Sequence, residues 1–198
     1  FYNKFKNSNI SIGAQNCHQS SNYGSFTGSI NAKLIKSTGA KYIIIGHSEN
    51  RNNGETDLII NKKIHSALKE NLKVIFCIGE KLSDKRKKNT FKVLKSQLYN
   101  GLKGIKKCKN IIFAYEPVWS IGTGRVPKSL ELIININSIR KILNNLKKSI
   151  NAKILYGGSV NPKNAKELAE IKEINGFLIG GASLSANKFI DIIKKSTN

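Results

Sequence analysis

Short apolar runs alternate along the chain with longer stretches in which apolar residues recur every three or four positions. The runs are rich in β-branched residues and are apolar almost throughout, which is typical of parallel strands buried on both faces. This pattern predicts six strands, over residues 10–14, 42–46, 74–79, 111–116, 154–157 and 176–180.

The stretches between these strands have helical periodicity. In one of them Leu132, Ile136, Ile139 and Leu143 follow one another at spacings of three and four, which lines one face of a helix with apolar groups. A strand followed by a helix, repeated six times, predicts an α/β fold, either a doubly wound sheet or a barrel. The predicted helices cover residues 29–38, 56–71, 87–103, 129–148, 164–171 and 186–195.

Polar residues or glycines follow every predicted strand. In both architectures ligands bind at the carboxyl ends of the strands, and a barrel brings several of these ends into one site. The first predicted strand is not followed by a glycine-rich dinucleotide fingerprint, and the chain has no Walker-type lysine loop. Both observations argue against a nucleotide site.

The length and composition fit one domain with a proper core. The chain has 198 residues, of which 39% are apolar, and domains commonly have roughly 100 to 200 residues. No apolar run approaches the ~20 residues of a membrane-spanning helix, and the first residues contain no apolar signal core. We therefore expect a cytoplasmic protein with no membrane partner. Because the chain contains no methionine, we expect residue 1 not to be the natural start.

A formal net charge of +22 raises the question of a nucleic-acid partner. Only four of the 34 basic residues are arginine, and the lysines are spread along the chain beside many asparagines and isoleucines. A nucleic-acid site commonly clusters its charge and uses arginine for paired contacts, whereas this composition is typical of an AT-rich genome. We expect no specific nucleic-acid partner, although the potential would attract phosphorylated anions. Cys17, Cys77 and Cys108 lack metal-ligand spacing, which predicts reduced structural thiols and no metal site.

Two strand ends carry side chains suited to proton transfer. His47 follows the second predicted strand, and Glu116 ends the fourth, which is apolar enough to desolvate the carboxylate and raise its pKa toward that of a useful base. Taken singly, His47 could be structural and Glu116 could be salt-bridged. As a pair they predict a site in which one group moves a proton at carbon and the other exchanges it at oxygen.

Two further features predict a site that binds an anion and closes over it. Residues 117–127 contain a proline at each end and an apolar centre with Trp119, which is typical of a lid, although an ordinary long loop would also fit. Paired glycines follow the last two predicted strands, at Gly157-Gly158 and Gly180-Gly181. They fit either tight turns or a phosphate cradle made of backbone N–H groups.

These residues belong to a set of short strings in which the chain closely resembles the triosephosphate isomerase family across essentially its whole length. Each matching string alone would be weak, but together they occur in the family's order and at its spacing. The strings are Gly13-Ala14-Gln15-Asn16, Ser25-Phe26-Thr27-Gly28, Ile45-Gly46-His47-Ser48-Glu49, Cys77-Ile78-Gly79-Glu80, Ala114-Tyr115-Glu116-Pro117-Val118-Trp119, Ile121-Gly122-Thr123-Gly124, Tyr156-Gly157-Gly158-Ser159-Val160 and Gly180-Gly181-Ala182-Ser183-Leu184.

The resemblance implies an aldose–ketose isomerase of glycolysis and gluconeogenesis that interconverts dihydroxyacetone phosphate and D-glyceraldehyde 3-phosphate with no cofactor. Glu116 would be the base that moves the proton through an enediolate, and neutral His47 would hydrogen-bond the two oxygens. Backbone N–H groups of Gly122, Ser159, Gly180 and Gly181 would bind the phosphate. In addition, Tyr156 would bond the closed lid, and a homodimer would form through the loop that begins at Gln15 and ends at Gly28.

The main departure from the family is length, because the family's barrel has eight strand–helix units and this chain shows six. We therefore expect residues 1–198 to form a single TIM-barrel domain that lacks the first two units. The strand with the family's Asn-x-Lys motif would be among those missing, so Glu49 would lose a cationic partner and the sheet would expose its edges. For this reason we expect the 198 residues alone to be inactive or nearly so.

A smaller departure concerns the dimer. The family usually has Glu and Arg at the positions of Ser29 and Asn50, so the salt bridge that steadies the dimer loop is replaced by two neutral residues, which we expect to affect the strength of dimerisation. Two other functions stay open. One is an inactive barrel remnant that binds polyanions through its charge, and the other is a different phosphate-binding barrel that shares the glycine loops but does not require His47 or Glu116.

Overall fold

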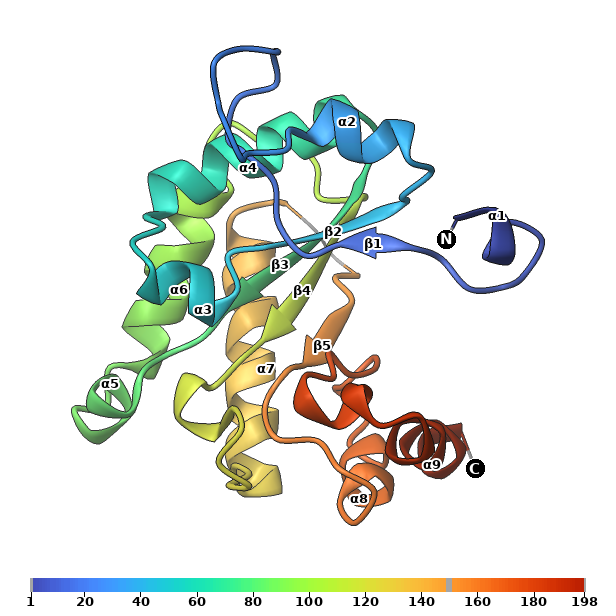
Figure 1. Cartoon of the computed structure of the whole chain (residues 1–198). Coiled ribbons are helices and arrows are strands. Elements are labelled where there is room, and N and C mark those ends of the chain that lie inside the picture. Colours follow the sequence, from blue (N-terminus) through green and yellow to red (C-terminus); the bar gives the residue numbers. More distant parts are fainter. Residues whose placement is uncertain (1, 149–150, 198) are drawn as a thin grey trace.

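The computed structural model describes residues 2–148 and 151–197, and it has a parallel sheet at its centre (Figure 1). The strand order follows the chain order without a reversal. A doubly wound sheet would reverse its order at a switch point, so this topology is that of a barrel. The strands are β1 (Gly13–Ala14), β2 (Tyr42–Ile45), β3 (Lys73–Ile78), β4 (Ile111–Tyr115) and β5 (Ile154–Tyr156).

Two of the six predicted strands are much shorter than the sequence indicates. Only Gly13 and Ala14 of the first one pair in the sheet, against Tyr42 and Ile43 of β2. The sixth, predicted over residues 176–180, is reduced to an isolated bridge between Tyr156 and Phe177. Both lie at the edges of the sheet, where a strand has hydrogen-bond partners on one side only.

Six strand–helix units are nevertheless present, because each strand and the bridge segment lead into helical structure. The α-helices are α1 (Tyr2–Phe5), α2 (Ala32–Ser37), α3 (Ser48–Asn52), α4 (Asp57–Lys69), α5 (Leu82–Arg86), α6 (Thr90–Gly101), α7 (Ser129–Asn145), α8 (Ala165–Ala169) and α9 (Ala186–Thr197). Two 3-10 helices, η1 (Val118–Ser120) and η2 (Gly181–Leu184), lie in loops at the carboxyl edge of the sheet. That the family's first two units are missing stays a prediction.

Local backbone geometry accounts for most differences between the predicted and the observed helices. Asn71, Lys88 and Lys147 have φ angles of 55°, 56° and 51°, in the left-handed region where a helix commonly ends. Accordingly α4 and α7 stop short of the predicted residues 71 and 148. The helix predicted over residues 87–103 is α6, which begins after Lys88, and the short helix α5 before it was not predicted. Helix starts follow capping chemistry: the side chain of Asn31 accepts a hydrogen bond from the N–H of Leu34 at the start of α2.

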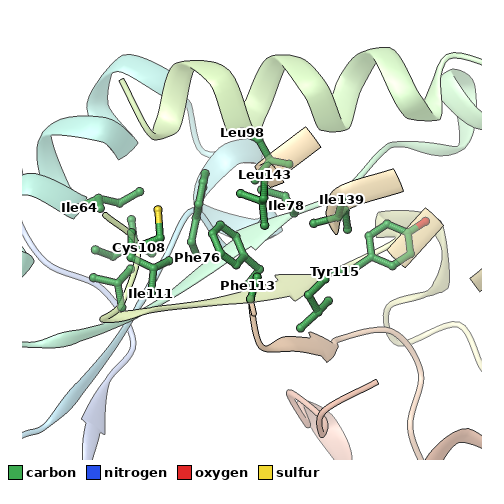
Figure 2. Close-up of a cluster of buried hydrophobic side chains, with 14 of the residues drawn as sticks. Ile64, Phe76, Ile78, Leu98, Cys108, Ile111, Phe113, Tyr115, Ile139 and Leu143 are labelled. Carbon is green, nitrogen blue, oxygen red and sulfur yellow. The ribbon is translucent and has the colours of Figure 1, made fainter. Parts of the chain in front are cut away.

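The core lies between the outer face of the sheet and the helices around it. Phe76 of β3 and Phe113 of β4 have ring centroids 6.2 Å apart, and Leu98 of α6 and Leu143 of α7 lie in the same cluster (Figure 2). The three cysteines are free and buried, as the sequence predicts for structural thiols. Alternate strand residues such as Ile44 point to the inner face of the sheet and are only half-buried.

The sheet does not close within the part of the chain that the structure describes. There β1 pairs with β2 alone, and beyond β5 lies only the bridge at Phe177. Apolar side chains of the last unit are exposed, with Leu184 at 91% and Ile190 at 49%. Among the described helices, we find none with the length and apolar character needed to cross a bilayer.

Gly79 directly follows β3 and lies against the backbone of Glu116, the residue that directly follows β4. Its N–H donates to Gln97 Oε1 at 2.9 Å, and Gln97 Nε2 donates back to its carbonyl at 3.1 Å. A Cβ at this position would lie 1.7 Å from the carbonyl oxygen of Glu116. The two strand ends can approach so closely only because residue 79 is glycine.

We therefore expect Gly79→Ala to lower the free energy of unfolding by about 3 kcal/mol or more, because the obstructing atom is backbone and the core is close-packed. Urea denaturation measures this loss. Gly180→Ala serves as the control, since no heavy atom lies within 4 Å of the position of its Cβ; equal stability of the two variants would contradict the steric explanation.

Candidate active site

A cavity of about 690 Å³ opens at the carboxyl edge of the sheet. Segments that follow β1, β2, β4 and β5 contribute to its wall, as do residues after the bridge at Phe177, and a barrel likewise brings several strand ends into one site. The structure brings together every residue that the sequence assigns to catalysis or phosphate binding, since the lining includes His47, Glu116, Gly122, Ser159, Gly180 and Gly181. Gln15 and Asn16, from the start of the predicted dimer loop, also line it.

His47 and Glu116 face each other in this cavity. Glu116 continues directly from β4, with its N–H donating to the carbonyl of Ile78 at 2.8 Å. His47 lies one residue after Gly46 at the end of β2 and caps the N-terminus of α3. Their side chains meet with 3.3 Å between His47 Nε2 and Glu116 Oε1. The pairing predicted from two strand ends is therefore present.

The carboxyl group of Glu116 is buried, with only 2% of the residue exposed. Burial raises its pKa from 4.5 to about 8, because desolvation penalises the charged form. Hydrogen bonds from the Ser48 N–H and the Cys77 thiol act in the opposite direction, as does the charge of Arg51. The sequence analysis predicts this rise in pKa from the apolar strand before Glu116.

The absence of a side chain at Gly157 leaves room for the Glu116 side chain. A Cβ on Gly157 would lie 2.8 Å from Glu116 Cγ, so a side chain at residue 157 would displace the Glu116 side chain. On its other side Glu116 Oε2 accepts from the N–H of Ser48 at 3.3 Å. Glu116 is thus held between the loop after β5 and the start of α3.

A hydrogen bond to His47 indicates which of its two ring nitrogens carries the proton. The N–H of Glu49 donates to His47 Nδ1 at 3.4 Å, which assigns Nδ1 as an acceptor. A neutral imidazole then carries its proton on Nε2, the nitrogen that faces Glu116. His47 can therefore present an N–H to an oxygen atom of a molecule in the cavity.

Arg51 supports this arrangement, and the sequence analysis did not assign it a role. Its Nε donates to the carbonyl of Gly46 at 2.7 Å, and its Nη2 donates to the carbonyl of Cys77 at 3.2 Å. Because Nη1 also pairs with Asp57 Oδ1 at 2.7 Å, the guanidinium joins the ends of β2 and β3. Its position four residues after His47, on the same short helix, was the available signal.

The tip of the predicted lid is exposed to solvent, and its Gly122 also lines the cavity. Residues 122–125 are exposed, and no heavy atom lies within 4 Å of a Cβ built on Gly122 or Gly124. The base of the lid is fixed: Trp119 Nε1 donates to Glu80 Oε1 at 2.8 Å, and the Lys85 ammonium lies 3.6 Å from the centroid of the indole ring. A firm base and a free tip are what a segment that closes as a unit requires.

The predicted phosphate cradle lines the same cavity as His47. Gly180 and Gly181 are exposed at the start of η2, with open space where a Cβ would stand. Ser159 belongs to the loop after β5, and its N–H donates to the Ser120 hydroxyl at 3.2 Å. In the described residues the lining contains no lysine or arginine, and no group of three or more His, Cys, Asp and Glu side chains could hold a metal ion.

Comparison with known proteins assigns this architecture to a family. A family model described as triosephosphate isomerase matches residues 1–196. The chain belongs to the triosephosphate isomerase family. It is 44% identical to the triosephosphate isomerase of Thermodesulfovibrio yellowstonii over 191 residues, which are 95% of this chain and 77% of that protein. It is 43% identical to that of Aquifex aeolicus over 189 residues, which are 93% and 76% of the two chains.

The fold comparison agrees with the sequence comparison. The crystal structure of triosephosphate isomerase from Bartonella henselae superimposes on the whole of this chain and on 81% of its own chain, with a TM-score of 0.90 and 36% identity. The TIM-barrel fold and the isomerase family predicted from the sequence are therefore confirmed. Nothing in these comparisons supports the alternative of a polyanion-binding remnant.

The raised pKa of Glu116 predicts that stability depends on pH. Between pH 4.5 and 8 the native carboxyl binds a proton that the unfolded carboxyl releases, so stability is greatest at the acidic end and falls as the pH rises. We expect a loss of up to about 1.4 kcal/mol per pH unit in this window, and Glu116→Gln should remove it. Urea denaturation at several pH values measures the difference.

The control for this experiment is Glu170→Gln, which removes one carboxylate from an exposed position on the surface. It should keep the slope of the unmodified chain. If Glu116→Gln and the unmodified chain lost stability in parallel from pH 5 to 8, burial of the Glu116 carboxyl would not be the cause.

Proposed function

We propose that this cavity interconverts dihydroxyacetone phosphate and D-glyceraldehyde 3-phosphate, with Glu116 and His47 as the catalytic residues. The observation that carries the proposal is the buried Glu116 carboxyl, 3.3 Å from His47 Nε2 at the wall of the cavity. Membership of the family supports the reaction, and the geometry supports the two roles. The reaction rearranges protons and one electron pair within the substrate, so it needs no co-reactant.

In the proposed mechanism Glu116 acts as the base. Its ionised carboxylate takes a proton from C1 of dihydroxyacetone phosphate, and the electron pair of the broken C–H bond forms the enediolate. The same carboxyl then returns the proton to C2, which yields the aldehyde at C1. A carboxyl with a pKa of about 8 is a stronger base than an exposed one and still releases its proton near neutral pH.

In this proposal His47 forms hydrogen bonds with O1 and O2 of the substrate. Its Nε2–H, oriented by the bond between the Glu49 N–H and Nδ1, hydrogen-bonds the carbonyl oxygen as negative charge develops there. Proton exchange between O1 and O2 through this nitrogen completes the isomerisation. Such a donor, fixed before the reaction begins, is typical of electrostatic stabilisation of an enediolate.

Phosphate binding is proposed for backbone N–H groups of Ser159, Gly180 and Gly181, with Gly122 joining them when the lid closes. All four residues line the cavity. Closure would exclude water and hold the enediolate in a shape that does not eliminate phosphate. Because no lysine or arginine lines the described cavity, little in its wall offsets the charge of the phosphate and the enediolate.

We therefore expect the 198-residue chain to turn over glyceraldehyde 3-phosphate far more slowly than the family's longer members, and the residual rate to depend on Glu116. A coupled assay on chain purified from an expression strain that lacks its own isomerase measures both. Glu116→Gln should lower the rate about 100-fold or more, to the background level. The matched control is Glu170→Gln, which should keep the residual rate; equal rates for the unmodified chain and Glu116→Gln would contradict the proposal.

We further propose that two copies of this chain associate through the loop that begins at Gln15 and ends at Gly28. This loop presents Tyr23, 64% exposed, and Phe26, 42% exposed. Inside the loop His18 stacks on Phe26, with 4.2 Å between ring centroids. Exposed aromatic groups on a preformed loop are typical of protein–protein contacts. A cytoplasmic location stays a prediction from the sequence.

Tyr23→Ala tests the dimer. We expect it to weaken association about tenfold or more, because the proposed contact would lose a large, exposed aromatic side chain. Sedimentation velocity over a range of concentrations gives the dissociation constant. Tyr99→Ala is the matched control, since this tyrosine on α6 is exposed to a similar extent, 60%; an equal effect of both substitutions would contradict a role for the loop.

A further inference from the structure

The segment that contains most of α5, all of α6 and the loop after them is positively charged throughout. Residues 85–115 include ten of the 34 basic residues of the chain and none of its 12 acidic residues. Lysine occurs along the whole chain, but here no aspartate or glutamate lies between the lysines. The charge of this segment is therefore not offset by acidic residues of its own.

The acidic side chains that border the segment already have partners. Asp84 Oδ2 accepts from the N–H of Lys81 at 3.1 Å. Glu131 Oε1, on α7, pairs with Lys85 Nζ at 2.6 Å, and the same ammonium lies 3.6 Å from the centroid of the Trp119 ring. Lys85 is thus occupied within the fold, and neither neighbouring carboxylate is free to pair with the remaining basic side chains.

Five exposed basic side chains of α5 and α6 have no ion pair with any carboxylate in the described part of the chain. They are Arg86, Lys87, Lys88, Lys92 and Lys95. Unpaired cations that lie close together repel one another and raise the local potential, which favours the binding of an anionic partner.

Two exposed aromatic rings lie among these charges. Phe91 and Tyr99 of α6 are 48% and 60% exposed. With Lys95 between them, they follow one another at intervals of four residues, which places all three on one side of the helix, and Lys92 lies beside them. The two aromatic residues are about 12 Å apart along the helix axis, since each residue adds about 1.5 Å. We call these two residues and the five basic ones the basic face.

The basic face does not have the form of a membrane-binding helix. Such a helix presents a continuous apolar side to the lipid, whereas the apolar side of α6 packs into the core, with Leu94 and Leu98 fully buried. Because α6 lies on the outside of the sheet (Figure 1), what it shows to solvent is two separate rings between lysines. This arrangement suits a partner that offers anionic and aromatic groups in alternation.

Single-stranded nucleic acid is a partner of this chemistry. Lysines follow its phosphates, and exposed aromatic rings stack on its unpaired bases. Lysine contacts a phosphate as a point charge and does not read base edges as paired arginine contacts do. Since Arg86 is the one arginine of the basic face, the expectation that the chain has no sequence-specific nucleic-acid partner is kept.

We infer that the basic face of α5 and α6 binds single-stranded nucleic acid without sequence preference. None of its residues is among those that line the cavity, so a bound strand leaves the candidate active site open. The inference is independent of the proposed isomerisation. It adds a binding surface to the outside of the isomerase fold, and it does not require a barrel that has lost its catalytic residues.

The test is the binding of a fluorescent oligo-uridine of about 12 nucleotides, a length within the usual range of site sizes, followed by anisotropy at several salt concentrations. We expect Lys92→Gln combined with Lys95→Gln to weaken binding about tenfold or more at low salt. The plot of log affinity against log salt should become less steep by about 1.4, since each phosphate contact on a single strand contributes about 0.7.

The matched control removes the same charge elsewhere. Lys163→Gln combined with Lys166→Gln changes two exposed lysines at the start of the α8 unit. It should keep the salt dependence of the unmodified chain and nearly all of its affinity. Equal losses in the two double variants would show that only the net charge matters, which would refute the basic face as a site.

Phe91→Ala tests the contribution of stacking. We expect binding to weaken about fivefold or more, because one base loses its aromatic partner, while the salt dependence stays unchanged. Phe189→Ala is the control, since this phenylalanine on α9 is also exposed, at 37%, and it should not change the affinity. If Phe91→Ala does not fold, Tyr99→Ala should show the same loss.

Three other outcomes overturn the inference. Absence of binding by the unmodified chain at low salt refutes it outright. If the lysine variant loses affinity but neither aromatic variant does, and inorganic polyphosphate competes as well as the strand, the face attracts anions by charge alone. Binding to vesicles of anionic lipid without binding to the oligo-uridine would assign the face to a membrane surface.

Discussion

The candidate site depends on the removal of one carboxyl group from water. Glu116 is buried because β4 ends against the loop after β5 and the start of α3, and because two glycines leave space there. Gly79 lets the backbone of Glu116 approach β3, and Gly157 leaves room for its Cγ. Burial alone would favour the protonated form entirely, but the Ser48 N–H, the Cys77 thiol and the charge of Arg51 offset part of the cost. The resulting carboxyl is a base that the sheet itself positions.

The electrostatic character of the site differs from that of the molecule. The formal charge is +22, yet the described wall of the cavity contains carboxylates, amides, backbone N–H groups and one imidazole, and no lysine or arginine. The overall charge can attract phosphorylated molecules toward the surface, but it cannot replace a cation in contact with them. Recognition within the cavity then depends on short-range donors at the glycine loops.

Sequence patterns predicted the strands that lie in the middle of the sheet and the residues at their carboxyl ends, because burial on both faces leaves a continuous apolar signal. His47 and Glu116 follow such strands, so their meeting could be expected. The edge segments at residues 10–14 and 176–180 were predicted too long, since apolarity does not show whether a neighbour is present. The helix ends predicted at residues 71 and 148 lie two or three residues beyond the ends of α4 and α7, and the short helix α5, which ends before Lys88, was not predicted. Arg51 acts through contacts with segments distant in the sequence, such as the carbonyl of Cys77, which no local pattern reveals.

The most direct test of this account is the titration of the Glu116 carboxyl itself. Carbon-13 NMR of chain labelled at the glutamate Cδ, with the signal assigned by its loss in Glu116→Gln, follows the protonation of this one group. Burial at the end of β4 predicts a midpoint near pH 8. A midpoint near 4.5, the ordinary value for this side chain, would show that water reaches the carboxyl in solution, and it would contradict the position of Glu116 as a desolvated base.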